Sequence, residues 1–238
     1  RQVLGGSFNV ALKPGMLESI QQGEDAPEGA IDVELKFANT DIAYIPELPP
    51  VRTGNATMTV SGMEFSVDIP EGKIDVANGM EIALSDGRFF IPDLRDDPQE
   101  GIVNFRAAAP TPAVLTLLDH KPLGYIAEVG LKPDFLGGTA TGEFTLSMPL
   151  VNDLDFKDIK MSGVARLQNA ITPNLVGDLG IQGGVVDVNL SSEGLSASGK
   201  VKIKDVPATV HWQRVFYAAE SQQPPISVTA VLDAEARE

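Results

Sequence analysis

Several segments of this chain alternate strictly between apolar and polar residues, and this pattern constrains the fold more than any other feature. It is clearest in residues 31–37 (IDVELKF), 64–69 (EFSVDI), 144–150 (FTLSMPL) and 185–190 (VVDVNL). A period of two places successive side chains on opposite faces of a β-strand. One apolar and one polar face are typical of antiparallel sheets. The sequence therefore predicts an all-β, mainly antiparallel fold.

Turn signals separate these segments. Pairs that end in glycine, such as Ser61-Gly62, Asn78-Gly79 and Asp86-Gly87, suit tight hairpins. Their recurrence indicates a meander of about twelve to fifteen strands. One short helix is expected near 112–119, with Thr111 as its cap and Pro112 in its first turn.

The chain divides into three regions on this pattern. We expect a strand and linker region over 1–30, a first β-meander unit with the short helix over 31–133, and a second unit over 134–238. One continuous sheet is the alternative. A faint internal repeat relates 60–67 (VSGMEFSV) to 190–197 (LSSEGLSA), and each copy is a strand, a tight turn and a second strand.

Composition excludes several classes of function. The net charge of −15 comes from 33 acidic and 18 basic residues and disfavours nucleic acid and anionic membrane surfaces as partners. The chain has no cysteine, which rules out disulfides and thiolate metal sites. No stretch reaches the roughly 18 apolar residues that a membrane span needs. We expect any targeting signal or anchor to lie outside these residues.

Chemistry-bearing motifs are sparse. The two histidines, His120 and His211, are expected to be structural, and no nucleophile elbow, P-loop or dinucleotide-binding glycine motif occurs. The acidic clusters at 93–97 and 153–158 lack the spacing of an EF-hand and are expected in solvated loops. The sequence predicts no enzyme, no cofactor and no metal site.

A family resemblance rests on short motifs in a fixed order. The motifs are 44–51 (YIPELPPV) with Gly54 and Ala56, 87–94 (GRFFIPDL), 117–125 (LLDHKPLGY), Gly138 and Ala140, 146–150 (LSMPL), 206–208 (VPA) and Trp212. Over roughly residues 30–216 this order resembles the central region of AsmA-like proteins of the YhdP type.

The resemblance implies a segment of a large periplasmic protein of the Gram-negative cell envelope, anchored in the inner membrane by a part outside these residues. It also implies a long sheet, curved or rolled, whose apolar concave face forms a hydrophobic groove. Such a groove shields acyl chains during phospholipid transport between inner and outer membranes, a role in outer-membrane homeostasis. The residues expected to line it are Val33, Leu35, Phe37, Phe65, Val67, Phe144, Leu146, Met148, Val188 and Leu190.

Two other functions stay open at this point. A structural or adhesive β-module would have a closed core and would bind protein partners through an exposed sheet edge. A glycan-binding fold would need exposed aromatic side chains, and only Trp212, Tyr44, Tyr125 and Tyr217 are available. For the ten apolar residues, ordinary core packing is the alternative to a groove. The deciding observation is what covers the apolar side of the strands.

Overall fold

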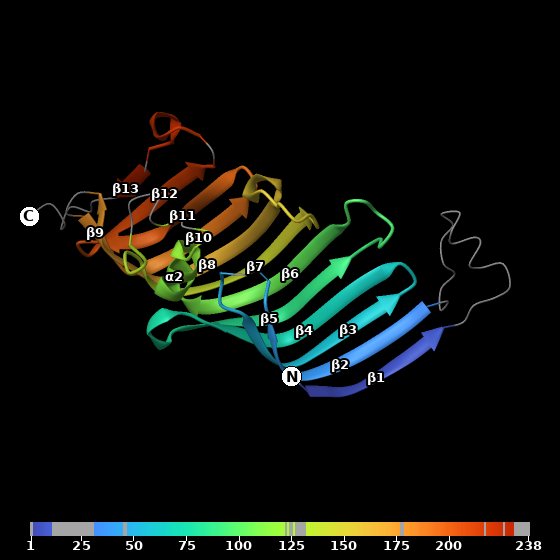
Figure 1. The fold of residues 1–238 in the computed structure, drawn as a ribbon. Helices are drawn as coiled ribbons and strands as arrows, with labels where there is room; N and C mark the ends of the chain where they lie inside the picture. Colours follow the sequence, from blue (N-terminus) through green and yellow to red (C-terminus); the bar gives the residue numbers. More distant parts are fainter. Residues whose placement is uncertain are drawn as a thin grey trace, which may run out of the picture.

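The computed structural model describes residues 2–10, 31–44, 47–121, 123, 126, 132–176, 179–216, 218–225 and 227–230. These residues form one antiparallel sheet with open edges, curved along its length, and one short α-helix (Figure 1). The predicted all-β class, the curved sheet and the single short helix are therefore confirmed.

The strands follow one another across the sheet in chain order. They are β1 (Gln2–Val10), β2 (Ile31–Ile42), β3 (Val51–Ser61), β4 (Glu64–Asp75), β5 (Glu81–Ile91), β6 (Glu100–Pro110), β7 (Gly137–Pro149), β8 (Lys160–Val176), β9 (Leu179–Gln182), β10 (Gly184–Ser191), β11 (Gly194–Ile203), β12 (Val206–Val215) and β13 (Ser227–Ala230). Each pairs with the next, except that β10 pairs with β8 and the short β9 pairs only with β8. This meander is what a series of tight hairpins produces.

The two units expected from the sequence contribute neighbouring strands to this one sheet. Strands β6 and β7, which lie on either side of the expected boundary at 133/134, pair from Glu100 opposite Pro149 to Pro110 opposite Thr139. The two hairpins related by the faint repeat also have matching turns. Val60 lies opposite Phe65 in β3 and β4, and Leu190 lies opposite Leu195 in β10 and β11.

Helix α2 (Thr111–Asp119) follows β6 directly and packs on the sheet over β5, β6 and β7. The predicted cap was wrong: the capping position is Pro110, no side chain caps the helix, and Thr111 is the first helical residue, with its hydroxyl buried. In the described connections, three short 3-10 turns occur, at η1 (Ala77–Gly79), η2 (Phe156–Asp158) and η3 (Glu220–Gln222).

A line of irregularities crosses the sheet from β2 to β5. Asn39 in β2 and Asp86 in β5 have positive φ angles of 49° and 51°, and the register of β5 against β6 shifts between Ser85 and Arg88. The register shift is a β-bulge, which adds one residue to β5 and bends that strand, whereas β2 keeps its register against β3 on both sides of Asn39. The alternation seen in the sequence is therefore interrupted at these points, although the same face of the sheet stays apolar on both sides of the line.

Candidate functional site

The strand register brings apolar residues from seven strands into one row. Residues directly opposite each other in an antiparallel pair project from the same face. The row that begins in β2 and ends in β8 runs through Leu35, Met58, Val67, Phe89, Val103, Leu146 and Met161. We call the side of the sheet that carries this row the apolar face.

All ten residues predicted to line a groove lie on the apolar face. Val33 and Phe65 both pair with Val60 in β3, and Phe37 pairs with Ala56 of the same strand. Phe144 pairs with Gly163 in β8, which in turn pairs with Leu190, so the face continues into the second half of the sheet. Met148 and Val188 lie on the same face by the alternation of β7 and β10. The sequence alternation thus identified the correct side of each strand.

The ten residues are all half-buried, neither sealed in a core nor fully exposed. This degree of exposure is what side chains in a single sheet layer have when they cover one another only sideways. Residues of the same surface that the sequence analysis missed include Met58, Val60, Phe89, Val103, Phe105 and Met161. In β5 and β6 the alternation is less regular, because Phe89 is followed by Phe90 and Val103 is preceded by Ile102.

Helix α2 covers the apolar face at one end of the central strands. Ala113 has no exposed surface and packs with Val51, Ile74, Ile82 and Ala109 of the sheet. Leu117, one helical turn further, packs against the same cluster. This end of the face is therefore a closed core.

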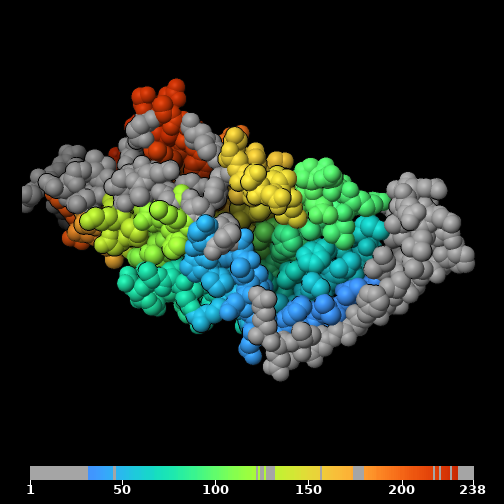
Figure 2. Space-filling view, viewed as in Figure 1, coloured from blue at the N-terminus to red at the C-terminus, as the bar shows by residue number. Residues whose placement is uncertain are grey.

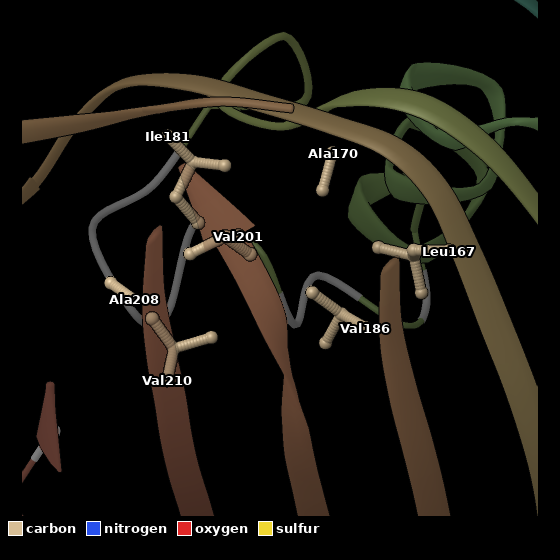
Figure 3. Packing of buried hydrophobic residues seen from close by; sticks show 7 residues of the cluster. All are labelled: Leu167, Ala170, Ile181, Val186, Val201, Ala208 and Val210. Carbon is tan, nitrogen blue, oxygen red and sulfur yellow. The ribbon is translucent and has the colours of Figure 1, made fainter. Parts of the chain in front are cut away.

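Strand β9 closes a second part of the face. It pairs with β8 and contacts β11, and Ile181 is 5% exposed. The side chains of this cluster converge from β8 to β12 in Figure 3. Its buried members are Leu167, Ala170, Ile181, Val186, Val201, Ala208 and Val210.

Away from these two clusters, no second sheet or helix of the described residues packs on the apolar face. Figure 2 shows the surface over β3 to β5 set back between the segment near residues 40–50, the connection near 95–100 and the connection near 150–160. Leu150, 39% exposed, stands at this margin close to Gly101. Its backbone N–H donates to the carbonyl of Gln99 over 2.8 Å. The two clusters lie along one margin of the apolar face, where Ala109, Ala140 and Leu167 pair, and the row from Leu35 to Met161 beside them is half-open.

Two aromatic rings lie side by side on the apolar face at β6 and β7. The ring of Phe144 stacks on that of Phe105 with 5.4 Å between centroids and 27° between planes. It also fills the space beside Gly142 and Gly163 that side chains at these positions would need. Glycine at both positions therefore leaves the room that the Phe144 ring needs.

The opposite face of the sheet is polar and carries ion pairs between strands. Arg88 in β5 contacts Glu64 of β4 at 2.8 Å, and Arg106 in β6 contacts Glu143 of β7 at 2.8 Å. Arg166 in β8 donates to Asp187 of β10 over 2.7 Å. All of these side chains are exposed, so this face is suited to water and not to packing against another apolar layer.

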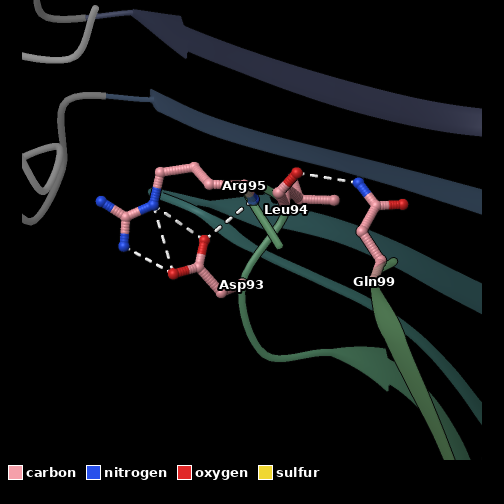
Figure 4. Close-up of polar contacts among 4 residues, drawn as sticks. All are labelled: Asp93, Leu94, Arg95 and Gln99. Carbon is pink, nitrogen blue, oxygen red and sulfur yellow. Dashed lines mark hydrogen bonds and ion pairs between the residues drawn. The ribbon is translucent and has the colours of Figure 1, made fainter. Parts of the chain in front are cut away.

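In each acidic cluster, one aspartate accepts hydrogen bonds from a basic residue two positions further along the chain. Arg95 donates through its backbone N–H and its Nε to Asp93 Oδ1, each over 2.9 Å (Figure 4). These hydrogen bonds, led by that from the guanidinium group, lower the pKa of Asp93 to about 2. A hydrogen bond from the backbone N–H of Lys157 is the main reason why the pKa of Asp155 is lowered.

The remaining candidates from the sequence are scattered. His120 ends α2, and His211 lies exposed on the polar face opposite Ser198. Trp212 lies on the apolar face opposite Ala197 and is 38% exposed, and Tyr44 is 44% exposed. Tyr125 and Tyr217 lie outside the described residues. These aromatic residues therefore provide no described common platform.

Among the described residues, no three acidic or histidine side chains lie close enough together to hold a metal ion. None of the helices found there is long and apolar enough to cross a membrane. Two cavities, one beside Thr172 and Ile181 and one beside Asn39 and Glu71, include none of the ten apolar residues in their walls.

Comparison of the chain with protein-family models, with curated proteins and with solved structures gives no match.

Proposed function

We propose that this chain is a segment of a periplasmic AsmA-like protein, and that the half-open apolar face of its sheet shields the acyl chains of phospholipids during transport between inner and outer membranes. The observation that carries the proposal is the continuous row of half-buried apolar residues across seven strands, backed by a polar, ion-paired face. The motif order described above supports the assignment to the cell envelope. In this role the protein is not an enzyme and needs no cofactor.

The dimensions of the face suit lipid tails. Seven strands spaced about 4.8 Å apart span about 29 Å from the first to the last. One leaflet of a bilayer contributes about half of a hydrocarbon core that is roughly 30 Å thick. An acyl chain therefore fits along the row with length to spare. Each methylene moved from water onto such a surface gains about 0.8 kcal/mol, so no specific polar contact is needed to hold it.

The chemical uniformity of the face supports transfer over fixed binding. The row contains aliphatic residues, two methionines and Phe89, and no charged residue interrupts it between Leu35 and Met161. A tail that slides along the row exchanges one apolar contact for another of similar strength. A sharply shaped pocket would instead hold one ligand in one place.

The single sheet layer favours this proposal over the adhesive module. That alternative requires a closed core, and the two clusters of buried residues in the described part of the chain lie beneath α2 and β9 and leave the row from Leu35 to Met161 half-buried. The periplasmic location and the inner-membrane anchor of the full-length protein are part of the same proposal and rest on the motif order.

The test compares two charge substitutions on one strand. Leu146 is half-buried on the apolar face, and Thr145 is exposed on the opposite face, where its hydroxyl donates to Asn104. The protein is purified from a Gram-negative host, and bound phospholipid is measured by native mass spectrometry and by lipid extraction. We expect wild type and Thr145→Glu to carry phospholipid, and Leu146→Glu to lose it while keeping its β-sheet circular dichroism spectrum.

A crosslinking experiment covers the case in which Leu146→Glu fails to fold. A photoreactive phenylalanine analogue replaces Leu146 or Thr145, and crosslinks to radiolabelled phospholipid are counted. The proposal predicts crosslinks from position 146 and background levels from position 145. A folded, lipid-free wild type, or equal crosslinking from both positions, overturns it.

A further inference from the structure

One arginine lies on the apolar face in the second half of the sheet. Arg214 of β12 pairs with Leu195 of β11, and both project from the apolar side. The other lysine, arginine and acidic residues of strands β7 to β12 project from the polar face; they are Glu143, Lys160, Arg166, Asp187, Lys200 and Lys202. Among the described residues of these strands, Arg214 is therefore the only one that brings a full charge to the apolar face.

Two rows of the apolar face end beside each other on β12. One row passes through Phe144, Gly163, Leu190 and Leu195 and ends at Arg214. The neighbouring row passes through Gly142, Ala165, Val188 and Ala197 and ends at Trp212, which is 38% exposed. Each row thus consists of apolar or absent side chains until it reaches β12, where it ends in a side chain with a polar tip.

Arg214 and Trp212 have the chemistry of a boundary between lipid and water. They are two residues apart on one strand, so their side chains are neighbours on the same face. Arginine can lay its apolar stem along a hydrophobic surface while its charged head stays in water. Tryptophan has an apolar ring and one N–H donor, and it is enriched where a membrane meets water. The planar guanidinium group also donates parallel pairs of hydrogen bonds to phosphate oxygens.

We propose that Arg214 binds the phosphate of a phospholipid whose acyl chains lie along these two rows, with Trp212 packed against the glycerol end of the chains. The inference rests on the proposed function and adds to it the position of the head group. Five strands spaced about 4.8 Å apart span about 19 Å from β12 to β7. This exceeds half of a hydrocarbon core that is roughly 30 Å thick, so the rows are long enough for the tails.

The surroundings of Arg214 are compatible with a bound phosphate. The residue is half-buried and already takes part in an interaction within the chain. A guanidinium group has several N–H donors in a fixed fork, so it can keep such a contact and also donate to a phosphate. The edge of β12 is occupied here by the amide of Gln223, which bonds to the backbone of Val215. The ligand is therefore expected over the face of the sheet and not along its edge.

The first experiment compares two lipids that have the same tails. Trp212 is the only tryptophan of the chain, so its fluorescence reports binding at this place. Dioctanoyl phosphatidylglycerol and dioctanoylglycerol, which lacks the phosphate, are titrated below their micelle concentrations. We expect wild type to bind the phospholipid about tenfold more tightly, as charge-assisted hydrogen bonds provide. Arg214→Gln should remove this preference. Lys202→Gln, which removes an exposed charge from the polar face, is the matched control and should keep it.

A second measurement uses wild type alone and so does not depend on the folding of a variant. Bromine atoms quench tryptophan fluorescence at contact, and phospholipids with bromine near the glycerol end or near the methyl end of their tails are compared. The proposal predicts strong quenching by the first and weak quenching by the second. Arg214→Lys keeps the charge but loses the planar fork, so it should retain part of the preference for phospholipid.

The results separate this inference from the proposed function. Equal affinity of wild type for the two lipids, or equal quenching by the two brominated lipids, overturns the inference and leaves the lipid-binding face in place. Inorganic phosphate that binds wild type as tightly as the phospholipid also overturns it, because the site would then be one for free phosphate. Binding of neither lipid contradicts the proposed function itself, and the inference fails with it.

Discussion

Phe144 lies directly opposite Gly163 in the pairing of β7 with β8, and its ring occupies the space that a side chain at position 163 would take. The ring also lies beside Gly142 of its own strand and stacks on Phe105. The large side chain of Phe144 thus occupies the space that the lack of a side chain at Gly163 leaves.

Gly163→Ala should destabilise the protein because its Cβ would meet both the Phe144 ring and the carbonyl of Glu143, at 2.8 Å. Overpacking of this kind costs about 1–3 kcal/mol. Urea unfolding followed by circular dichroism measures the change. Gly54→Ala is the control, because nothing lies within 4 Å of a Cβ at that position. Equal stability of the two variants would show that the ring moves aside freely.

Ile181→Ala and Ile171→Ala should differ sharply in their effect on the free energy of unfolding. Ile181 is 5% exposed in the cluster beneath β9, and Ile171 on the partner strand is 53% exposed. Truncation of a buried isoleucine costs about 2–5 kcal/mol, whereas an exposed substitution usually changes stability by less than about 0.5 kcal/mol. Urea titration of both variants tests this. Similar losses would mean that β9 does not close a core.

Arg88→Ala should cost little stability, and the cost should fall with salt. Arg88 contacts Glu64 at 2.8 Å and Asp68 at 3.9 Å, and it lies 5.4 Å from the centroid of the Phe90 ring. Exposed ion pairs contribute about 0.2–1 kcal/mol, and raising salt from about 0.1 M to 1 M shortens the screening length from about 10 Å to 3 Å.

Melting temperatures of wild type, Arg88→Ala and Lys200→Ala at the two salt concentrations provide the measurement. Lys200 lies on the same polar face and serves as the control. If the Arg88→Ala deficit stays constant across salt, the contribution of Arg88 comes from packing of its stem and not from charge.

Asp93→Asn should lower stability at neutral pH and match wild type at strongly acidic pH. The folded pKa of Asp93 is about 2, below its ordinary value of 3.8, chiefly because of hydrogen bonds from Arg95. A group whose pKa is lower in the folded state stabilises the fold above its unfolded pKa, and this contribution disappears as pH falls through the folded pKa. The difference between the two proteins should therefore shrink between pH 4 and pH 2.

Thermal melts at half-unit steps of pH follow this change. Because Asp93 lies in an exposed connection, the effect should be small. A difference that is constant from pH 7 to pH 2 would show that the carboxylate does not act through its ionisation.

The local pattern of this sequence determined the class of fold and the side of each strand. Alternation placed Val33, Leu146 and Val188 on one face, because a period of two is a property of the extended backbone itself. The tight turns at Ser61-Gly62 and Asn78-Gly79 were also visible in the sequence. At Asp86, however, the structure has a bulge inside β5 where a hairpin was expected, because the same positive φ angle suits both.

Only the tertiary structure decided what covers the apolar face. The depth of burial of Ala113 and Ile181 depends on where α2 and β9 fold back, and such long-range contacts leave no periodic signal. The two hydrogen bonds between the backbone of Val215 and the side chain of Gln223 join residues eight apart, and nothing distinguishes Gln223 from Gln222 until the backbone turns. Side-chain alternation is local and can be read from the sequence, but the covering of the apolar face arises from segments that meet only in the folded chain.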